Sequence, residues 1–247
     1  MNYCEKGDLF DYVRKHEKLS ESQIKKLMIQ LIGVVHMIHR LNVIHRDLKP
    51  DNILIKNTKG LNISLIDFGL ACYNDDYQWK QKRCGTPGFM APEIIRQHVF
   101  DLNSDIFSLG CIFYFLNVKK YLFQGVSVKQ SPEGIDLMKK MLSKDPRNRL
   151  SAEKCFQHQW FQTDAEYCQK IIENNVIFAE MKNNGAYEGE EELKNESDDS
   201  GSINQSAQLP DFKGVLEVKD FNQILDCNQK MSNRNIAANH RVFIQRN

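Results

Sequence analysis

Apolar residues recur at steps of three and four along residues 21–41, with polar or charged residues at many positions between them. The recurring positions are Ile24, Leu27, Met28, Leu31, Val35 and Ile38. This period places the apolar side chains on one face of an α-helix. Ser20 followed by Gln23 forms a capping box, in which each side chain bonds the backbone of the other residue. The pattern predicts a long amphipathic helix over residues 21–41.

Two short apolar or alternating runs, residues 52–55 and 61–66, follow that helix and are joined by Lys-Asn-Thr-Lys-Gly at 56–60. Runs of this length around such a connector are typical of a β-hairpin. Further apolar runs predict helices around residues 104–116, 132–143 and 151–158. We therefore expect residues 1–162 to be mainly helical, an α+β domain with one small hairpin.

Beyond residue 162 the pattern changes. Residues 165–182 have enough apolar positions for one more helix, whereas residues 185–209 are rich in Glu, Asn, Ser, Asp and Gly, a composition that favours disorder. Residues 211–226 alternate apolar and charged residues without a clear face, which favours a solvated linker over a partner-binding segment. We expect a folded domain over 1–162 and a polar, acidic, partly disordered tail over 163–247.

Charge and cysteine content narrow the functional classes. The formal net charge of +1 gives no reason to expect nucleic acid or an anionic membrane as a partner. The seven cysteines are widely spaced and include no Cys-x-x-Cys pair, which favours free thiols in a reducing compartment. The most apolar stretch, residues 106–116, is about half as long as a membrane span, and no secretory signal pattern opens the chain. We expect a soluble, cytoplasmic protein.

Three motifs carry the chemistry. Residues 45–52 read His-Arg-Asp-Leu-Lys-Pro-Asp-Asn, residues 67–69 read Asp-Phe-Gly, and residues 85–93 read Gly-Thr-Pro-Gly-Phe-Met-Ala-Pro-Glu. Asp-Phe-Gly alone is a weak signal, but the three motifs in this order and spacing are very specific. Residues 1–162 resemble the C-terminal lobe of eukaryotic-type serine/threonine protein kinases, most like the calcium/calmodulin-dependent group. The resemblance implies a helical bundle with the small hairpin at the active site.

The resemblance implies that Asp47 accepts the proton of the substrate hydroxyl and that Lys49 places an ammonium beside the transferring phosphate. Asn52 and Asp67 would bind Mg²⁺ through oxygen, the ligand type that this cation prefers. ATP and Mg²⁺ would be the cofactors, and proteins bearing Ser or Thr the substrates. Lys49-Pro50 together with Thr86, a substrate-positioning residue, resembles serine/threonine kinases rather than tyrosine kinases.

Other matched positions have structural roles in the family. Glu93 should pair with Arg149, and Asp105 should anchor the backbone of the catalytic loop; both would be buried, so breaking either would leave a lone charge. Gly69 is expected to give the backbone after Asp67 conformations that are closed to residues with a side chain. The remaining structural positions are His45, Arg46 and Phe68, of which Arg46 is ready to receive an activating phosphate.

The first ten residues resemble the hinge of the family and the start of the helix that follows it. A backbone amide and carbonyl near Cys4 would bond adenine, Asp8 would reach the ribose, and Leu54 would form an apolar floor under the base. The alternative is an ordinary helix start with Asp8 as its N-cap.

The chain departs from the family pattern in three places. It contains no Gly-x-Gly-x-x-Gly and no Val-Ala-x-Lys sequence, so the resemblance implies a C-lobe without its N-lobe and weak binding of ATP. Residues 118–132 stand where kinases of this look carry an additional helix and loop. Lys82 occupies the position where many kinases carry a phosphorylatable Thr, so we expect no switch by phosphorylation at that site.

Two alternatives to an active kinase remain open. One is a catalytically silent, kinase-like (pseudokinase) binding module, although an intact set of Asp47, Lys49, Asn52 and Asp67 argues against it. The other is a truncated gene product with an exposed apolar lobe interface. The sequence shows neither a basic amphipathic calmodulin target nor a calcium-binding Asp-x-Asp-x-Asp-Gly loop.

Overall fold

The structure is a computed structural model that describes residues 7–183, apart from residues 17, 59, 98 and 125–127. The two tail segments for which we expect disorder or a linker, 185–209 and 211–226, lie outside the described residues. The α-helices are α1 (Leu9–Lys15), α2 (Glu21–Arg40), α3 (Tyr77–Lys80), α4 (Pro92–Gln97), α5 (Leu102–Val118), α6 (Pro132–Met141), α7 (Ala152–Phe156) and α8 (Ala165–Asn183). The 3₁₀ turns are η1 (Pro50–Asn52), η2 (Leu122–Gln124), η3 (Pro146–Asn148) and η4 (Gln159–Asp164).

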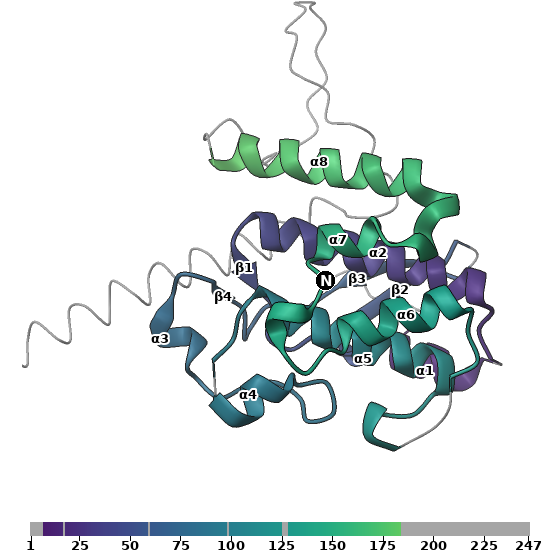
Figure 1. Cartoon of the computed structure of the whole chain (residues 1–247), viewed down its shortest axis with the longest axis horizontal. Helices are drawn as coiled ribbons and strands as arrows, with labels where there is room; N and C mark the ends of the chain where they lie inside the picture. The colour runs from purple at the N-terminus through teal and green to yellow at the C-terminus, as the bar shows by residue number, and fades with distance from the viewer. Residues whose placement is uncertain (1–6, 17, 59, 98, 125–127, 184–247) are drawn as a thin grey trace, which may run out of the picture.

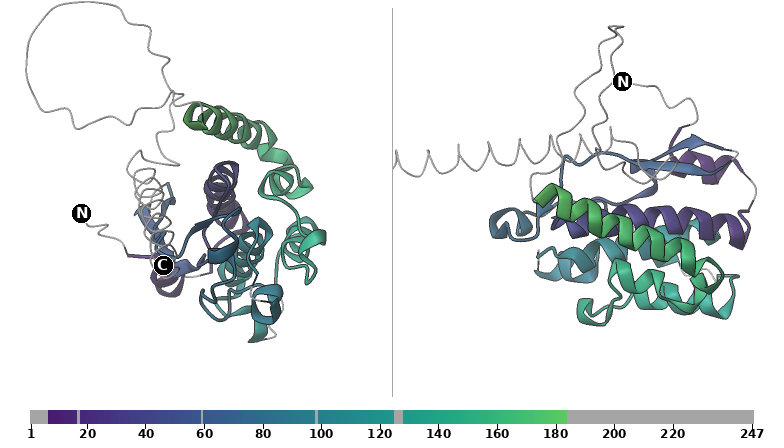
Figure 2. Two further views of the ribbon diagram at one scale, coloured as in Figure 1. Left: turned by 90° about the vertical axis from the view of Figure 1, so that its left-hand side faces the viewer. Right: turned by 90° about the horizontal axis from the view of Figure 1, so that it is seen from above.

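Helix α2 lies at the centre of the fold and matches the amphipathic helix predicted over residues 21–41. Its capping box is present: the Ser20 hydroxyl accepts from the Gln23 amide, and the Gln23 side chain accepts from the Ser20 amide. Helix α2 contacts α5 as well as α7 and α8, and α6 packs against α5 (Figure 1). In Figure 2, α8 (green) lies next to α2 (purple) in both views.

Helix α5 is buried on nearly all sides, as its apolar sequence predicts. The Asp101 side chain caps the N-terminus of α5 by accepting a hydrogen bond from the Ser104 amide at 2.9 Å. The Ser104 hydroxyl in turn accepts a hydrogen bond from the Asp101 amide. This start places Asp105, of which only 1% is exposed, in the first turn and inside the core. Across the described part of the chain, no helix is both long enough and apolar enough to cross a membrane.

Two short antiparallel strand pairs hold the motif-bearing loops. β1 (Val43–Ile44) pairs with β4 (Cys72–Tyr73), with Val43 opposite Tyr73. β2 (Ile53–Asn57) pairs with β3 (Asn62–Leu65), with Ile53 opposite Leu65, at the positions where the sequence predicts a hairpin. Residues 45–52 therefore connect β1 to β2, while residues 66–71 connect β3 to β4. The pairing brings these two connections to the same edge of the domain.

A buried ion pair joins α4 to the segment that precedes α7. The guanidinium of Arg149 contacts both carboxylate oxygens of Glu93 at 2.5 Å and also donates to the backbone oxygens of Ser143 and Asn103. The side chain of Arg149 is fully buried and that of Glu93 is 9% exposed. The bidentate geometry of the pair and the additional backbone acceptors of Arg149 offset much of the free-energy cost of removing both charges from water.

We expect Glu93→Gln to lower the free energy of unfolding by roughly 3–5 kcal/mol, because it leaves the Arg149 guanidinium buried without a counter-charge. Urea unfolding followed by circular dichroism measures this. Arg147→Gln is the matched control, since Arg147 pairs with Asp145 at the surface and its side chain is 87% exposed. Equal unfolding midpoints for the two variants would contradict a structural role for the buried pair.

Candidate active site

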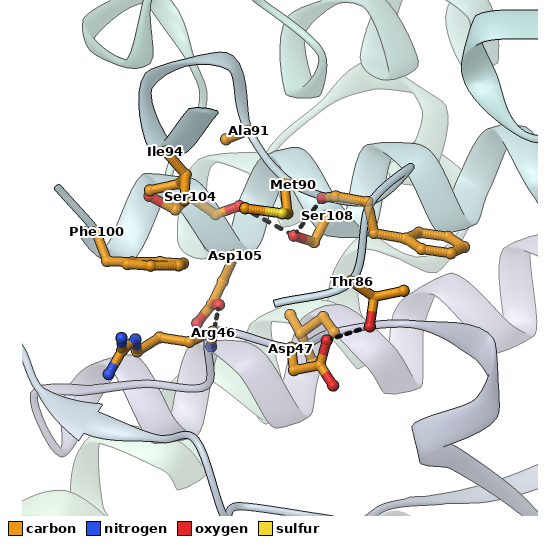
Figure 3. Close-up of a pocket in the computed structure, with 12 residues that line it drawn as sticks. Arg46, Asp47, Thr86, Met90, Ala91, Ile94, Phe100, Ser104, Asp105 and Ser108 are labelled. Atoms are coloured by element: carbon orange, nitrogen blue, oxygen red, sulfur yellow. Dashed lines mark hydrogen bonds between the residues drawn. The ribbon is translucent and has the colours of Figure 1, made fainter. Parts of the chain in front are cut away.

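The catalytic-loop motif, residues 45–52, lies between β1 and β2 and includes η1, and its consecutive residues Arg46 and Asp47 point in opposite directions. Figure 3 shows Asp47 facing Thr86, while the Arg46 side chain extends the other way, beneath Phe100. Asp47 is only 8% exposed and Arg46 5%. The same residues line a cavity that continues under the segment from Thr86 to Ile94 toward Ser108 on α5.

Asp47 is the centre of a compact polar cluster. Its Oδ2 atom accepts from the Lys49 ammonium at 2.8 Å, and its Oδ1 atom accepts from the Thr86 hydroxyl at 2.6 Å. Lys49 also donates to the Thr86 hydroxyl at 2.9 Å, so the three side chains form a closed triangle. Asn52 adds a bond from Nδ2 to the Asp47 backbone oxygen at 2.9 Å.

This environment controls the ionisation of Asp47. Burial raises the pKa of its carboxyl, but the hydrogen bonds from Lys49, Thr86 and Asn52 outweigh burial, and the pKa lies below its usual value. Asp47 is therefore an anion at neutral pH. A carboxylate that already shares two bonds at fixed geometry is well placed to orient a third donor, such as an alcohol.

Asp105 holds the backbone of the loop. Its Oδ2 atom accepts from the His45 amide at 2.9 Å and its Oδ1 atom from the Arg46 amide at 3.0 Å. The His39 ring, in the last turn of α2, lies 3.0 Å from the same Oδ2 atom. These contacts support a positive φ of 72° at Arg46, a conformation that costs free energy in any residue other than glycine.

The role of His39 was not predicted from the sequence. A histidine in the last turn of a helix is only a weak indication of a role in the site, because the helix dipole also favours histidine at that position. Only the packing of α2 against α5 shows that His39 shares a carboxylate with the catalytic loop.

His45 is completely buried beneath this loop and its ring lies against Phe68, with centroids 4.8 Å apart. Burial lowers the pKa of His45 and exceeds the opposing effect of the Asp105 charge, so the ring is neutral. Nδ1 accepts from the Asp47 amide at 3.3 Å, which assigns the proton to Nε2, 3.3 Å from the Ile66 oxygen. His45 thus links the two loops that carry Asp47 and Asp67.

The expectation for Gly69 was wrong in its reason. Gly69 is not among the glycines with positive φ; Asp67 itself takes the left-handed conformation, with φ of 63°. A Cβ atom at Gly69 would lie 3.0 Å from the Asp67 Oδ1 atom, closer than ordinary van der Waals contact, so the carboxylate would have to shift to accommodate it. The Gly69 amide donates to that oxygen at 3.2 Å. The backbone of Gly69 therefore lies close to the Asp67 carboxylate.

Asn52 and Asp67 have the donor atoms that Mg²⁺ requires. The hydrogen bonds of Asn52 to Asp47 run through Nδ2, which leaves its amide oxygen for a cation. The Asp67 side chain is exposed and accepts from the Gly69 amide. Among the residues that the structure describes, no group of three or more His, Cys, Asp or Glu forms a metal site. Proteins hold magnesium with one or two carboxylates while substrate phosphates and water complete its coordination.

The residues expected at an adenine site are only partly described, because Cys4 lies outside the described residues. Asp8 caps α1 by accepting from the Asp11 amide at 2.8 Å, which is the ordinary helix-start alternative. The Asp8 backbone also bridges to Leu54 on β2. The two residues are therefore neighbours, although the cap already uses one carboxylate oxygen of Asp8.

Residues 86–89 form a tight turn that presents Thr86 to Asp47. The Phe89 amide donates to the backbone oxygen of Thr86 at 3.2 Å, and Gly88 has φ of 98°. Proline followed by a glycine with positive φ is the signature of a type II β-turn, and Pro87-Gly88 supplies it. The Phe89 oxygen accepts from Ser108 on α5, which fixes the far end of the turn.

Arg46 contacts the segment between the Asp-Phe-Gly and Gly-Thr-Pro motifs, residues 70–84. Its Nη2 atom donates to the Lys82 backbone oxygen at 2.5 Å, and its guanidinium stacks over Phe100 with 4.6 Å between Cζ and the ring centroid. The Lys82 ammonium lies 3.5 Å from the centroid of the Trp79 ring. The sequence identified Arg46 and the unusual Lys82 but not Phe100 or Trp79, whose contacts depend on the fold.

Comparisons with known proteins agree with this geometry. The family described as "Protein kinase domain" matches residues 1–161. The chain is 32% identical over 210 residues to the "Carbon catabolite-derepressing protein kinase" of Candida glabrata, covering 77% of this chain and 34% of that protein. It is 34% identical to "Serine/threonine-protein kinase cds1" of Schizosaccharomyces pombe, covering 66% and 41%. It is also 34% identical to "SNF1-related protein kinase catalytic subunit alpha KIN12" of Arabidopsis thaliana, covering 65% and 35%.

The chain thus spans between about a third and two fifths of the length of these relatives. The family match itself extends over more than half of the chain and contains every residue of the site around Asp47. On this basis the chain belongs to the protein kinase family.

Proposed function

We propose that this chain carries the C-terminal lobe and the phosphoryl-transfer centre of a serine/threonine protein kinase. The reaction moves the γ-phosphate of ATP to a Ser or Thr hydroxyl of a protein. The observation that carries the proposal is the closed triangle of Asp47, Lys49 and Thr86, in which an anionic carboxylate and an ammonium are fixed within 3 Å of one hydroxyl. Carboxylate, ammonium and hydroxyl are the groups that such a transfer uses.

Each residue of the site has its own role in this transfer. Asp47 orients the substrate hydroxyl and accepts its proton as the oxygen attacks the γ-phosphorus and the bond to the leaving ADP breaks. Lys49 places positive charge beside the transferring group. Thr86 holds the side chains of Lys49 and Asp47 in position through its hydrogen bonds to both. Asn52 and Asp67 would hold magnesium, which when bound neutralises phosphate charge.

We also propose that the activation segment of this kinase, residues 70–84, is ordered without phosphorylation. The position of Lys82 offers no hydroxyl, and its backbone oxygen already occupies a donor of Arg46. The stacking of Arg46 on Phe100 and of Lys82 on Trp79 supports the same arrangement. The chain's own contacts replace those that a phosphate would make.

We expect Asp47→Asn to reduce phosphate transfer to a protein substrate by roughly 10²–10⁴-fold, since the amide cannot accept the proton. Transfer from radiolabelled ATP is measured with the longest form of the protein that cells express. Asp51→Asn is the matched control, because Asp51 is an exposed carboxylate of the same loop. Equal transfer before and after the Asp47 change would rule out catalysis by this residue.

Thr86→Val should raise the pKa of Asp47, because it removes the 2.6 Å hydrogen bond that favours the anion. A depressed carboxyl pKa stabilises the fold above the unfolded pKa, and that stability is lost as pH falls through the folded pKa. In the variant this loss begins at higher pH. Carbon NMR titration of the Asp47 carboxyl tests the shift, with Thr163→Val as an exposed control. An unchanged Asp47 pKa would show that Thr86 does not support the anion.

Phosphatase treatment should leave the activity unchanged, and so should the double variant Tyr73→Phe with Tyr77→Phe. These tyrosines are the hydroxyl-bearing residues between positions 70 and 84. Activity is compared with mass spectrometry of the tryptic peptides from this segment. A phosphate on either tyrosine, lost together with activity, would contradict phosphate-independent ordering.

A further inference from the structure

Helix α8 begins beyond residue 161, where the family match ends, yet it is built into the core. Its buried residues recur at steps of three and four and face α2 and α7, which lie beside it in Figure 1. They are Cys168, Ile171, Ile172, Asn175, Phe178 and Ala179. An apolar face with this period that contains one buried amide is a specific docking surface rather than a solvated tail.

The sequence of α2 is adapted to this contact at Gly33. Glycine in the middle of a helix costs roughly 0.5–1 kcal/mol relative to alanine. A Cβ atom at Gly33 would lie 3.2 Å from the Ile171 Cγ2 atom and 3.8 Å from the Phe156 ring. The absence of a side chain therefore lets α8 approach the backbone of α2 closely.

Asn175 makes the polar contact at the same place. It is 1% exposed, and its Nδ2 atom donates to the Gly33 backbone oxygen at 2.9 Å and lies 3.0 Å from the His36 Nδ1 atom. Burial lowers the pKa of His36 to about 4, so the ring is neutral and Nδ1 is an acceptor. Its Nε2 atom is buried and makes no hydrogen bond within the described residues. Asn175 is thus the hydrogen-bond partner that fixes the His36 ring.

His39 follows His36 by nearly one turn of α2, and it contacts Asp105 at 3.0 Å. Asp105 in turn accepts from the amides of His45 and Arg46. A rotation or shift of α2 along its axis therefore moves His39 relative to the carboxylate that holds the catalytic loop. The contacts of α8 with Gly33 and His36 restrain that movement.

We infer that α8 is a positioning element for the catalytic loop, acting through Asn175, His36 and the register of α2. The inference goes beyond the proposed function. Its consequence for catalysis rests on that function, whereas its consequence for the conformation of the loop does not. A helix outside the matched kinase domain thereby sets the geometry around Asp47.

Amide hydrogen exchange in the full chain, followed by NMR, tests the inference without any assay of activity. Asn175→Leu and Gly33→Ala both disturb the docking of α8, the second while raising the helix propensity of α2. We expect the amides of His45 and Arg46 to exchange about fivefold to tenfold faster in each variant. The amide of Phe113, inside α5, should keep its rate. Lys170→Ala, on the exposed face of α8, should change none of these rates.

A cycle with His39→Ala identifies the route. In that background Asn175→Leu should cause no further acceleration at His45, because the link to Asp105 is already removed. Unchanged exchange at His45 and Arg46 in both α8 variants would overturn the inference. So would equal acceleration at Phe113, which indicates general loss of stability. If Asn175→Leu fails to fold, Gly33→Ala decides the question alone.

Discussion

The carboxylate of Asp105 binds two consecutive amides of the catalytic loop and also contacts His39, and the rest of the site depends on this arrangement. A buried anion is tolerated only where donors surround it, and backbone amides are donors that mutation of side chains does not remove. By fixing the amides of His45 and Arg46, Asp105 allows the strained backbone of Arg46. That backbone turns Asp47 toward Thr86 and Arg46 toward Phe100.

Different buried polar groups thus join different parts of the fold. The Glu93–Arg149 pair joins elements that bear no chemistry, while Asp105 joins the core helix α5 to the loop that does. Between them, α5 is buried almost throughout and provides a rigid base for both. Arg46 and Asp67, two residues of the site, have positive φ, a conformation that costs free energy in residues other than glycine.

Sequence predicted best those features that depend on neighbouring residues. The α2 helix with its Ser20 cap and the helix over residues 165–183 follow from local period and capping. The motifs were enough to indicate the family, because residues of the site such as Asp47, Lys49 and Asn52 lie close together in the sequence, within one short loop. The roles of His39, Phe100 and Asn175 were not predictable, since each depends on a contact across many residues. For Gly69, a plausible backbone argument was wrong because Asp67, and not Gly69, takes the left-handed conformation.

The separation in sequence between Asp105 and the loop has a consequence for biosynthesis. His45 and Asp105 are 60 residues apart, so the loop is synthesised well before the carboxylate that holds it. Contacts of this range must bear the entropy of closing a long segment, and they form late in folding. During translation, α2 and the loop leave the ribosome while α5 is still being made. We therefore expect nascent chains of this protein to expose the apolar face of α2 for several seconds and to be clients of chaperones that bind such faces.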